Sequence, residues 1–98
     1  MNGYNSLKTD KRLFDKIKAL NGISGIYAII GKETWRSYVG QSIDVGIRLY
    51  THFLDLFNNK HINAELQLDF NKFGSIVFDV ELLEITNNHL ELGQLEEK

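Results

Sequence analysis

Two short apolar runs, joined by a polar turn and followed by an amphipathic segment, constrain the fold of this 98-residue chain most. Residues 24–30 are apolar and rich in isoleucine, which is typical of a buried strand. Residues 31–33 predict a turn, and residues 35–39 return as the antiparallel partner. Residues 40–42 are expected to end that strand, and Asp44 is expected to cap a helix that runs to about Phe57. The pattern therefore predicts a β-hairpin that leads into a helix.

Helical and alternating spacing of apolar residues accounts for the rest of the chain. We expect a first helix capped by Thr9 or Asp10, another over residues 63–72 ending at Gly74, a strand over residues 76–82, and a last helix capped by Asn87 or Asn88. The first helix and the helix after Asp44 are each expected to turn one apolar face toward the core. The side chains on these two faces are Leu13, Phe14, Ile17 and Leu20, and Leu49, Tyr50, Phe53 and Phe57. This order predicts an α/β fold, a small three-stranded sheet with an antiparallel hairpin, flanked by helices. The pattern leaves the strand order open.

Composition excludes several classes of protein. The chain has no cysteine, its N-terminus lacks the apolar stretch of a signal peptide, and no apolar run is long enough to span a membrane. We therefore expect a cytoplasmic protein with no membrane contact. The net charge of −2 divides into +3 for residues 1–75 and −5 for residues 76–98. Contacts with a polyanion are expected in the basic part, with Arg36, Lys60 and Lys72 as candidates.

Tyr27, Tyr38, Arg48 and His52 are the residues with the greatest potential for chemistry. Arg48 and His52 have i, i+4 spacing, so they project from one face of the predicted helix. A tyrosine in a strand is more often a packing residue, and an arginine on a helix more often pairs with a carboxylate such as Asp44 or Asp55. A free phenol titrates near pH ~10, so Tyr27 can accept a proton at neutral pH only if nearby cations stabilise its anion. The remaining histidines, His61 and His89, are expected at the surface.

The order of these residues resembles the GIY-YIG nuclease family. The first signature is Gly25-Ile26-Tyr27, the second is Tyr38-Val39-Gly40 with valine in place of isoleucine, and the Arg-x-x-x-His spacing of Arg48 and His52 follows. The resemblance implies an endonuclease that hydrolyses DNA phosphodiesters with one Mg²⁺ or Mn²⁺ ion. It implies that Tyr27 or His52 accepts a proton from water, Tyr38 positions that water, Arg48 stabilises the phosphorane, and Glu96, with Glu97 as the alternative, holds the metal.

The resemblance also predicts the domain organisation. It covers residues 24–98 as a nuclease core and leaves residues 1–23 as an N-terminal helical addition. The last helical pattern still runs at Lys98, and a family asparagine expected beyond the glutamate has no counterpart, so we expect a truncated domain and a further DNA-binding domain after Lys98. Homing, restriction and DNA repair all remain open as roles. The alternative function is a catalytically impaired nucleic-acid-binding or interaction domain of the same fold.

Overall fold

The computed structural model of the protein describes residues 3–86 and contains the predicted hairpin, helices and third strand. In chain order the elements are α1 (Gly3–Thr9), α2 (Lys11–Lys18), β1 (Gly25–Gly31), β2 (Arg36–Ser42), α3 (Val45–Phe57), α4 (Ala64–Phe73), the short 3₁₀ helix η1 (Ser75–Val77) and β3 (Phe78–Ile85). The predicted last helix lies outside the described residues, as do Glu96 and Glu97. No helix of the described part is long and apolar enough to cross a membrane.

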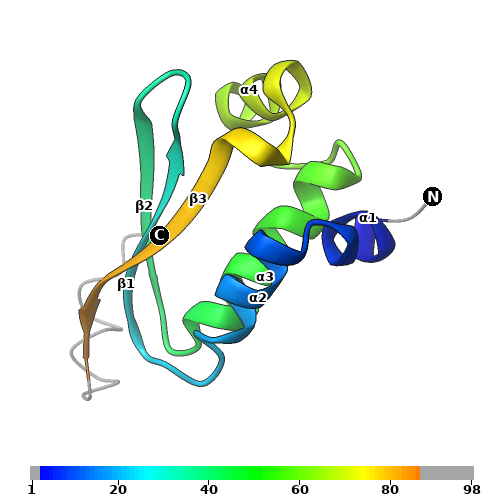
Figure 1. The fold of residues 1–98 in the computed structure, drawn as a ribbon. Helices are drawn as coiled ribbons and strands as arrows, with labels where there is room; N and C mark the ends of the chain where they lie inside the picture. The colour runs from blue at the N-terminus through cyan, green and yellow to red at the C-terminus, as the bar shows by residue number, and fades with distance from the viewer. Residues whose placement is uncertain (1–2, 87–98) are drawn as a thin grey trace.

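The sheet has the strand order β2-β1-β3, and both pairings are antiparallel. The central strand β1 therefore holds the hairpin partner on one side and the distant β3 on the other. In the hairpin, Tyr27 lies opposite Gly40 and Ile29 lies opposite Tyr38. The four helices of residues 3–86 lie on one side of the sheet; Figure 1 shows the sheet at the left and these helices to its right. The predicted α/β arrangement with a hairpin at its centre is confirmed.

The hydrophobic core lies between this sheet and the helices. Its fully or nearly fully buried residues from the strands include Tyr27, Ile29, Phe78 and Val80, and those from the helices include Leu7, Leu13, Ile17, Leu49, Phe53, Leu56, Leu66 and Phe70. Phe14, Leu20, Tyr50 and Phe57 pack against this core while partly buried, so the predicted apolar stripes face inward. The sequence pattern missed α1, in which only Leu7 is a buried apolar side chain.

Side chains cap the starts of α2, α3 and α4. The carboxylate of Asp10, one of the two predicted caps of its helix, accepts the N–H of Leu13. The side chain of Asn63, for which no cap was predicted, accepts the N–H of Leu66. Asp44 accepts the N–H of Ile47 at 3.1 Å and also that of Gly22 at 2.9 Å. The second bond ties the start of α3 to the loop that follows α2.

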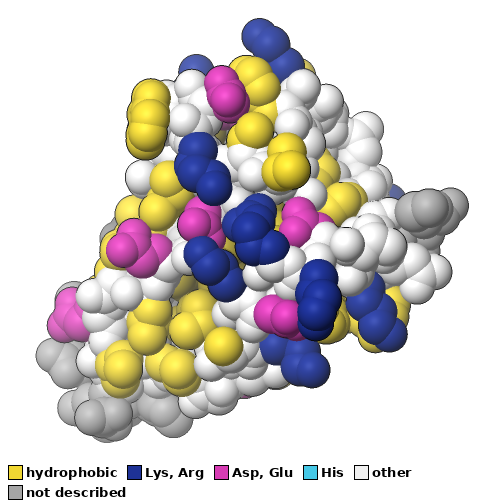
Figure 2. All heavy atoms as spheres, in the orientation of Figure 1, with side chains coloured by type: hydrophobic (Ala, Val, Ile, Leu, Met, Phe, Trp, Pro, Cys, Tyr) yellow, Lys and Arg dark blue, Asp and Glu magenta, His cyan; other side chains and the backbone are white. Residues whose placement is uncertain are grey.

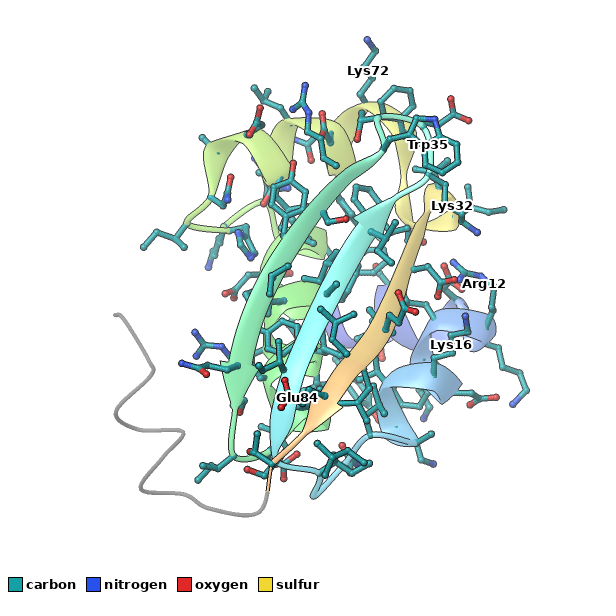
Figure 3. All side chains as sticks on the ribbon, turned by 90° about the vertical axis from the view of Figure 1, so that its left-hand side faces the viewer. Arg12, Lys16, Lys32, Trp35, Lys72 and Glu84 are labelled. Carbon is teal, nitrogen blue, oxygen red and sulfur yellow. The ribbon has the colours of Figure 1, made fainter. Side chains whose placement is uncertain are left out.

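The hairpin differs from prediction at both ends. The strand β2 continues through Gly40 to Ser42, because residues 40–42 pair with residues 25–27 of β1, and the phenol of Tyr27 lies where a side chain at position 40 would be. Trp35, expected to begin the strand, lies instead in the turn, with φ of +61° and a side chain that is 80% exposed. Figure 3 shows Trp35 at the free end of the hairpin, near Lys32. Ile76, expected in the third strand, lies in η1 and is exposed.

Candidate active site

Tyr27 is held by the hairpin itself. Its side chain is only 3% exposed, and its ring packs in the core beneath Gly40 of the neighbouring strand. A Cβ atom at position 40 would lie 2.6 Å from Cζ of Tyr27, so only glycine leaves room for the phenol. The other signature glycine, Gly25, passes close to β3, where a Cβ would collide with the carbonyl oxygen of Glu84. The two signature glycines are therefore packing requirements, Gly40 for the phenol of Tyr27 and Gly25 for the approach of β3.

The hydroxyl of Tyr27 begins a chain of hydrogen bonds through two histidines. Oη of Tyr27 lies 2.8 Å from Nε2 of His52, and Nδ1 of His52 lies 2.8 Å from Nε2 of His61. The backbone N–H of Asn63 donates to Nδ1 of His61 at 3.0 Å. The prediction that His61 is a solvated surface residue is therefore wrong, because the loop between α3 and α4 folds its ring against that of His52, with ring centroids 5.0 Å apart.

The direction of this chain follows from its last member. A backbone N–H can only donate, so Nδ1 of His61 carries no proton and the neutral ring has its proton on Nε2. That N–H donates to Nδ1 of His52, which leaves Nε2 of His52 to donate to the oxygen of Tyr27. Burial, followed by the charges of His61 and Arg48, lowers the pKa of His52 from 6.5 to about 4. Burial also lowers the pKa of His61, so both rings are neutral at pH 7.

Tyr38 is held by a second set of partners, which come from β2 and α4. Its hydroxyl donates to Oδ2 of Asp69 on α4 at 3.2 Å. Arg36 on β2 lies 2.6 Å from Oε2 of Glu65 and 3.4 Å from Oδ2 of Asp69. Burial raises the pKa of Tyr38, and the negative charge of Asp69 adds to this effect while Arg36 opposes it. Tyr38 is therefore a neutral phenol.

A cavity of about 200 Å³ opens between the two phenols. Its walls are formed by Tyr27, Ile29, Tyr38, Val39, His52, His61, Ile62, Asn63 and Leu66. Tyr27, Tyr38 and His52 thus meet at one place, as the sequence predicts, and His61 joins them. Arg48 is exposed and its side chain does not line the cavity. It lies one helical turn before His52, and its charge lowers the pKa of both histidines, so it acts on this site through space.

The described residues do not by themselves complete a metal site. Within residues 3–86, no group of three or more His, Asp or Glu side chains is placed to hold a metal ion. The histidine nitrogens are engaged with each other, with Tyr27 and with Asn63, and Asp69 is engaged with Tyr38 and Arg36. A single carboxylate with water and phosphate oxygens is enough for Mg²⁺, so the prediction for Glu96 or Glu97 concerns a part of the chain outside these residues.

The three expected nucleic-acid contacts differ in their surroundings. Arg36 already faces two carboxylates, which compete with a phosphate for its guanidinium. Lys60 and Lys72 are exposed and form no ion pair with another residue of the range 3–86. Figure 2 shows Lys and Arg side chains across the middle of one face, with Asp and Glu side chains between them. That face is not a uniformly basic surface.

The fold resembles that of solved endonuclease domains. No protein-family model matches the chain, and no match was found among curated proteins. Two solved structures match, both of the catalytic domain of I-TevI. One, an alanine variant of this intron endonuclease, is 37% identical, with a TM-score of 0.64 and 71% of each chain covered. The other, described as a homing endonuclease, is 34% identical, with a TM-score of 0.62, and covers 72% of this chain and 78% of that chain. With Tyr27, Tyr38 and Val39 of the two signatures lining one cavity and this identity over more than two thirds of its length, the chain belongs to the GIY-YIG endonuclease family.

Proposed function

We propose that this protein is an active endonuclease domain that hydrolyses DNA phosphodiester bonds with the help of one divalent metal ion. The observation that carries the proposal is the directed chain of hydrogen bonds from Asn63 through His61 and His52 to the oxygen of Tyr27. A chain that only packed the core would not need three polar side chains in series. A donor aimed at a phenol oxygen favours the phenolate, which is a base strong enough to activate water.

The sequence left open whether Tyr27 or His52 accepts the proton, and the direction of the chain favours Tyr27. Nε2 of His52 already carries a proton and donates it to Tyr27, so it has no lone pair for water. In the proposed step, an O–H bond of water breaks, its proton passes to the phenolate of Tyr27, and the oxygen forms a bond to phosphorus. The bond to the leaving oxygen breaks, and that oxygen takes a proton from solvent.

The other residues stabilise charge and orientation. The guanidinium of Arg48 is proposed to neutralise the negative charge that develops on the phosphoryl oxygens, which pre-organised cations do well. Tyr38 holds the attacking water. Charge on the leaving oxygen would be stabilised by Mg²⁺ or Mn²⁺, for which Glu96, or alternatively Glu97, is the proposed ligand. Lys60 and Lys72 are proposed phosphate contacts, and a net charge of −2 predicts weak DNA binding by this chain alone.

The test is nicking of supercoiled plasmid DNA with Mg²⁺, with Mn²⁺ and with a chelator. Tyr27→Phe and Arg48→Ala should each lower the rate by about 10²–10³-fold or more. Tyr50→Phe is the matched control, because Tyr50 lies on the far side of α3 beside Tyr4. This variant should cleave DNA as fast as the parent. An equal rate for Tyr27→Phe and the parent would refute the role of Tyr27. DNA binding without cleavage under any metal condition would instead support the impaired, nucleic-acid-binding alternative.

A further inference from the structure

The hydrogen of the Tyr38 hydroxyl has a definite direction. Its partner is Oδ2 of Asp69, 3.2 Å away, and an ionised carboxylate can only accept a hydrogen bond. The side chain of Asp69 is 13% exposed, so water has little access to compete for it. The hydroxyl hydrogen is therefore turned toward α4.

Arg36 holds Asp69 in place. Its Nη1 atom lies between two carboxylates of α4, at 2.6 Å from Glu65 and 3.4 Å from the same Asp69 oxygen that accepts from Tyr38. Glu65 and Asp69 are four residues apart, so both lie on the face of α4 that is turned toward β2. The cation compensates the charge of Asp69 and fixes the position of the accepting oxygen.

The two phenol oxygens can both accept hydrogen bonds in the cavity between them. Because the Tyr38 hydrogen points to Asp69 and the guanidinium of Arg36 can only donate to the phenol oxygen, one lone pair of that oxygen is left for the cavity. The oxygen of Tyr27 likewise accepts a hydrogen bond, from His52. A water molecule in this cavity can therefore donate its hydrogens to the two phenol oxygens, and its own lone pair is left for the phosphorus atom.

We propose that Asp69, anchored by Arg36, is a positioning residue that makes Tyr38 a hydrogen-bond acceptor for the attacking water. This inference rests on the proposed nuclease function. It also gives Arg36 a role inside the protein instead of the DNA contact expected from the sequence. Among residues 3–86, the charged and titratable groups near the Tyr38 phenol are Arg36 on its own strand, Glu65 and Asp69 on α4, and Tyr27 with the two neutral histidines across the cavity.

Asp69→Ala tests the proposal, because alanine removes the acceptor and favours the helix in which it lies. We expect kcat for plasmid nicking to fall by about 10- to 100-fold, as expected for a misplaced reacting group, with KM for DNA changed less than about threefold. In the Tyr38→Phe background, Asp69→Ala should cause no further loss of kcat. Glu65→Ala is the matched control, because it removes the shorter ion pair with Arg36 and keeps the hydrogen bond between Asp69 and Tyr38.

A second measurement does not depend on cleavage. Asp69 raises the pKa of Tyr38, so Asp69→Ala should move the ultraviolet titration of this phenol, identified by its loss in Tyr38→Phe, to lower pH. In an active enzyme the alkaline limit of kcat should move the same way. An unchanged kcat with an unchanged titration overturns the proposal, and so does an equal loss of kcat in Glu65→Ala, which would mean that the ion pairs only join β2 to α4. A parent protein that never cleaves DNA refutes the nuclease function, and the titration alone then decides whether Asp69 orients Tyr38.

Discussion

Replacing Gly40 with alanine would displace the Tyr27 phenol and leave the tyrosine side chain itself unchanged. The new Cβ would start 2.6 Å from Cζ of Tyr27, whereas ordinary van der Waals contact begins at about 3.4 Å, so the ring or the strand must move by roughly 1 Å. The bond from Tyr27 to His52 is 2.8 Å long, and a shift of that size takes it outside the usual range for a hydrogen bond. Overpacking of this kind costs about 1–3 kcal/mol of folding stability.

The expected effect on cleavage is larger than the effect on folding. A misplacement of about 1 Å at a reacting group lowers the rate by about 10²-fold, so Gly40→Ala should nick plasmid DNA about a hundred times more slowly while its melting temperature falls only by several degrees. Gly31→Ala, in the same hairpin, is the control, because its Cβ would meet the Thr34 hydroxyl at 3.1 Å and no cavity residue. Adding Gly40→Ala to Tyr27→Phe should cost little further activity. Parental cleavage by Gly40→Ala would refute the argument.

Three further predictions concern stability and metal binding. The pKa of His52 is about 4 in the folded protein and about 6.5 in the unfolded chain, so the unfolded state binds more protons between these pH values. The free energy of unfolding, measured by urea titration, should therefore drop by about 3 kcal/mol from pH 6.5 to pH 4. The same pH dependence in His52→Gln as in the parent would contradict this. Trp35→Gly should raise the free energy of unfolding by about 1 kcal/mol, because glycine adopts the positive φ of this position without steric strain. Lys32→Gly in the same turn is the control and should give no such gain. A less stable Trp35→Gly protein would show that the indole contributes packing. Glu96→Gln should abolish Mg²⁺ binding in calorimetry and cleavage together, and loss in Glu97→Gln alone would move the ligand by one residue.

Local patterns in the sequence were sufficient for much of this fold. The cap at Asp44, and the cap of the first predicted helix at Thr9 or Asp10, could be predicted because a cap is decided by a side chain and an amide three residues later. The meeting of Tyr27 and Tyr38 with His52 follows from the predicted hairpin and helix, whereas Arg48, which has i, i+4 spacing with His52, does not line the cavity.

Contacts between distant segments were beyond such reasoning. His61 lies in a loop with no periodicity, and its place beside His52 depends on how α3 and α4 are joined. The link from Tyr38 to Asp69 spans 31 residues and requires α4 to pack along β2. Glycine weakens strands in general, so the sequence predicts a break at Gly40, and only the register opposite Tyr27 shows why a glycine is needed within the strand.

The first two helices define where this nuclease can be shortened. Leu7, Leu13 and Ile17 are 0–2% exposed in the same core as α3, and Asp44 binds the loop after α2 as well as its own helix. Removing residues 1–23 would delete these three buried side chains and expose the apolar surface of the core that they cover. At about 1.5–3 kcal/mol for each lost side chain, the cost is comparable with the whole stability of a small domain. The region that carries the family signatures is therefore smaller than the region that folds, and a deletion made at the edge of the signatures should give insoluble protein and not a minimal enzyme.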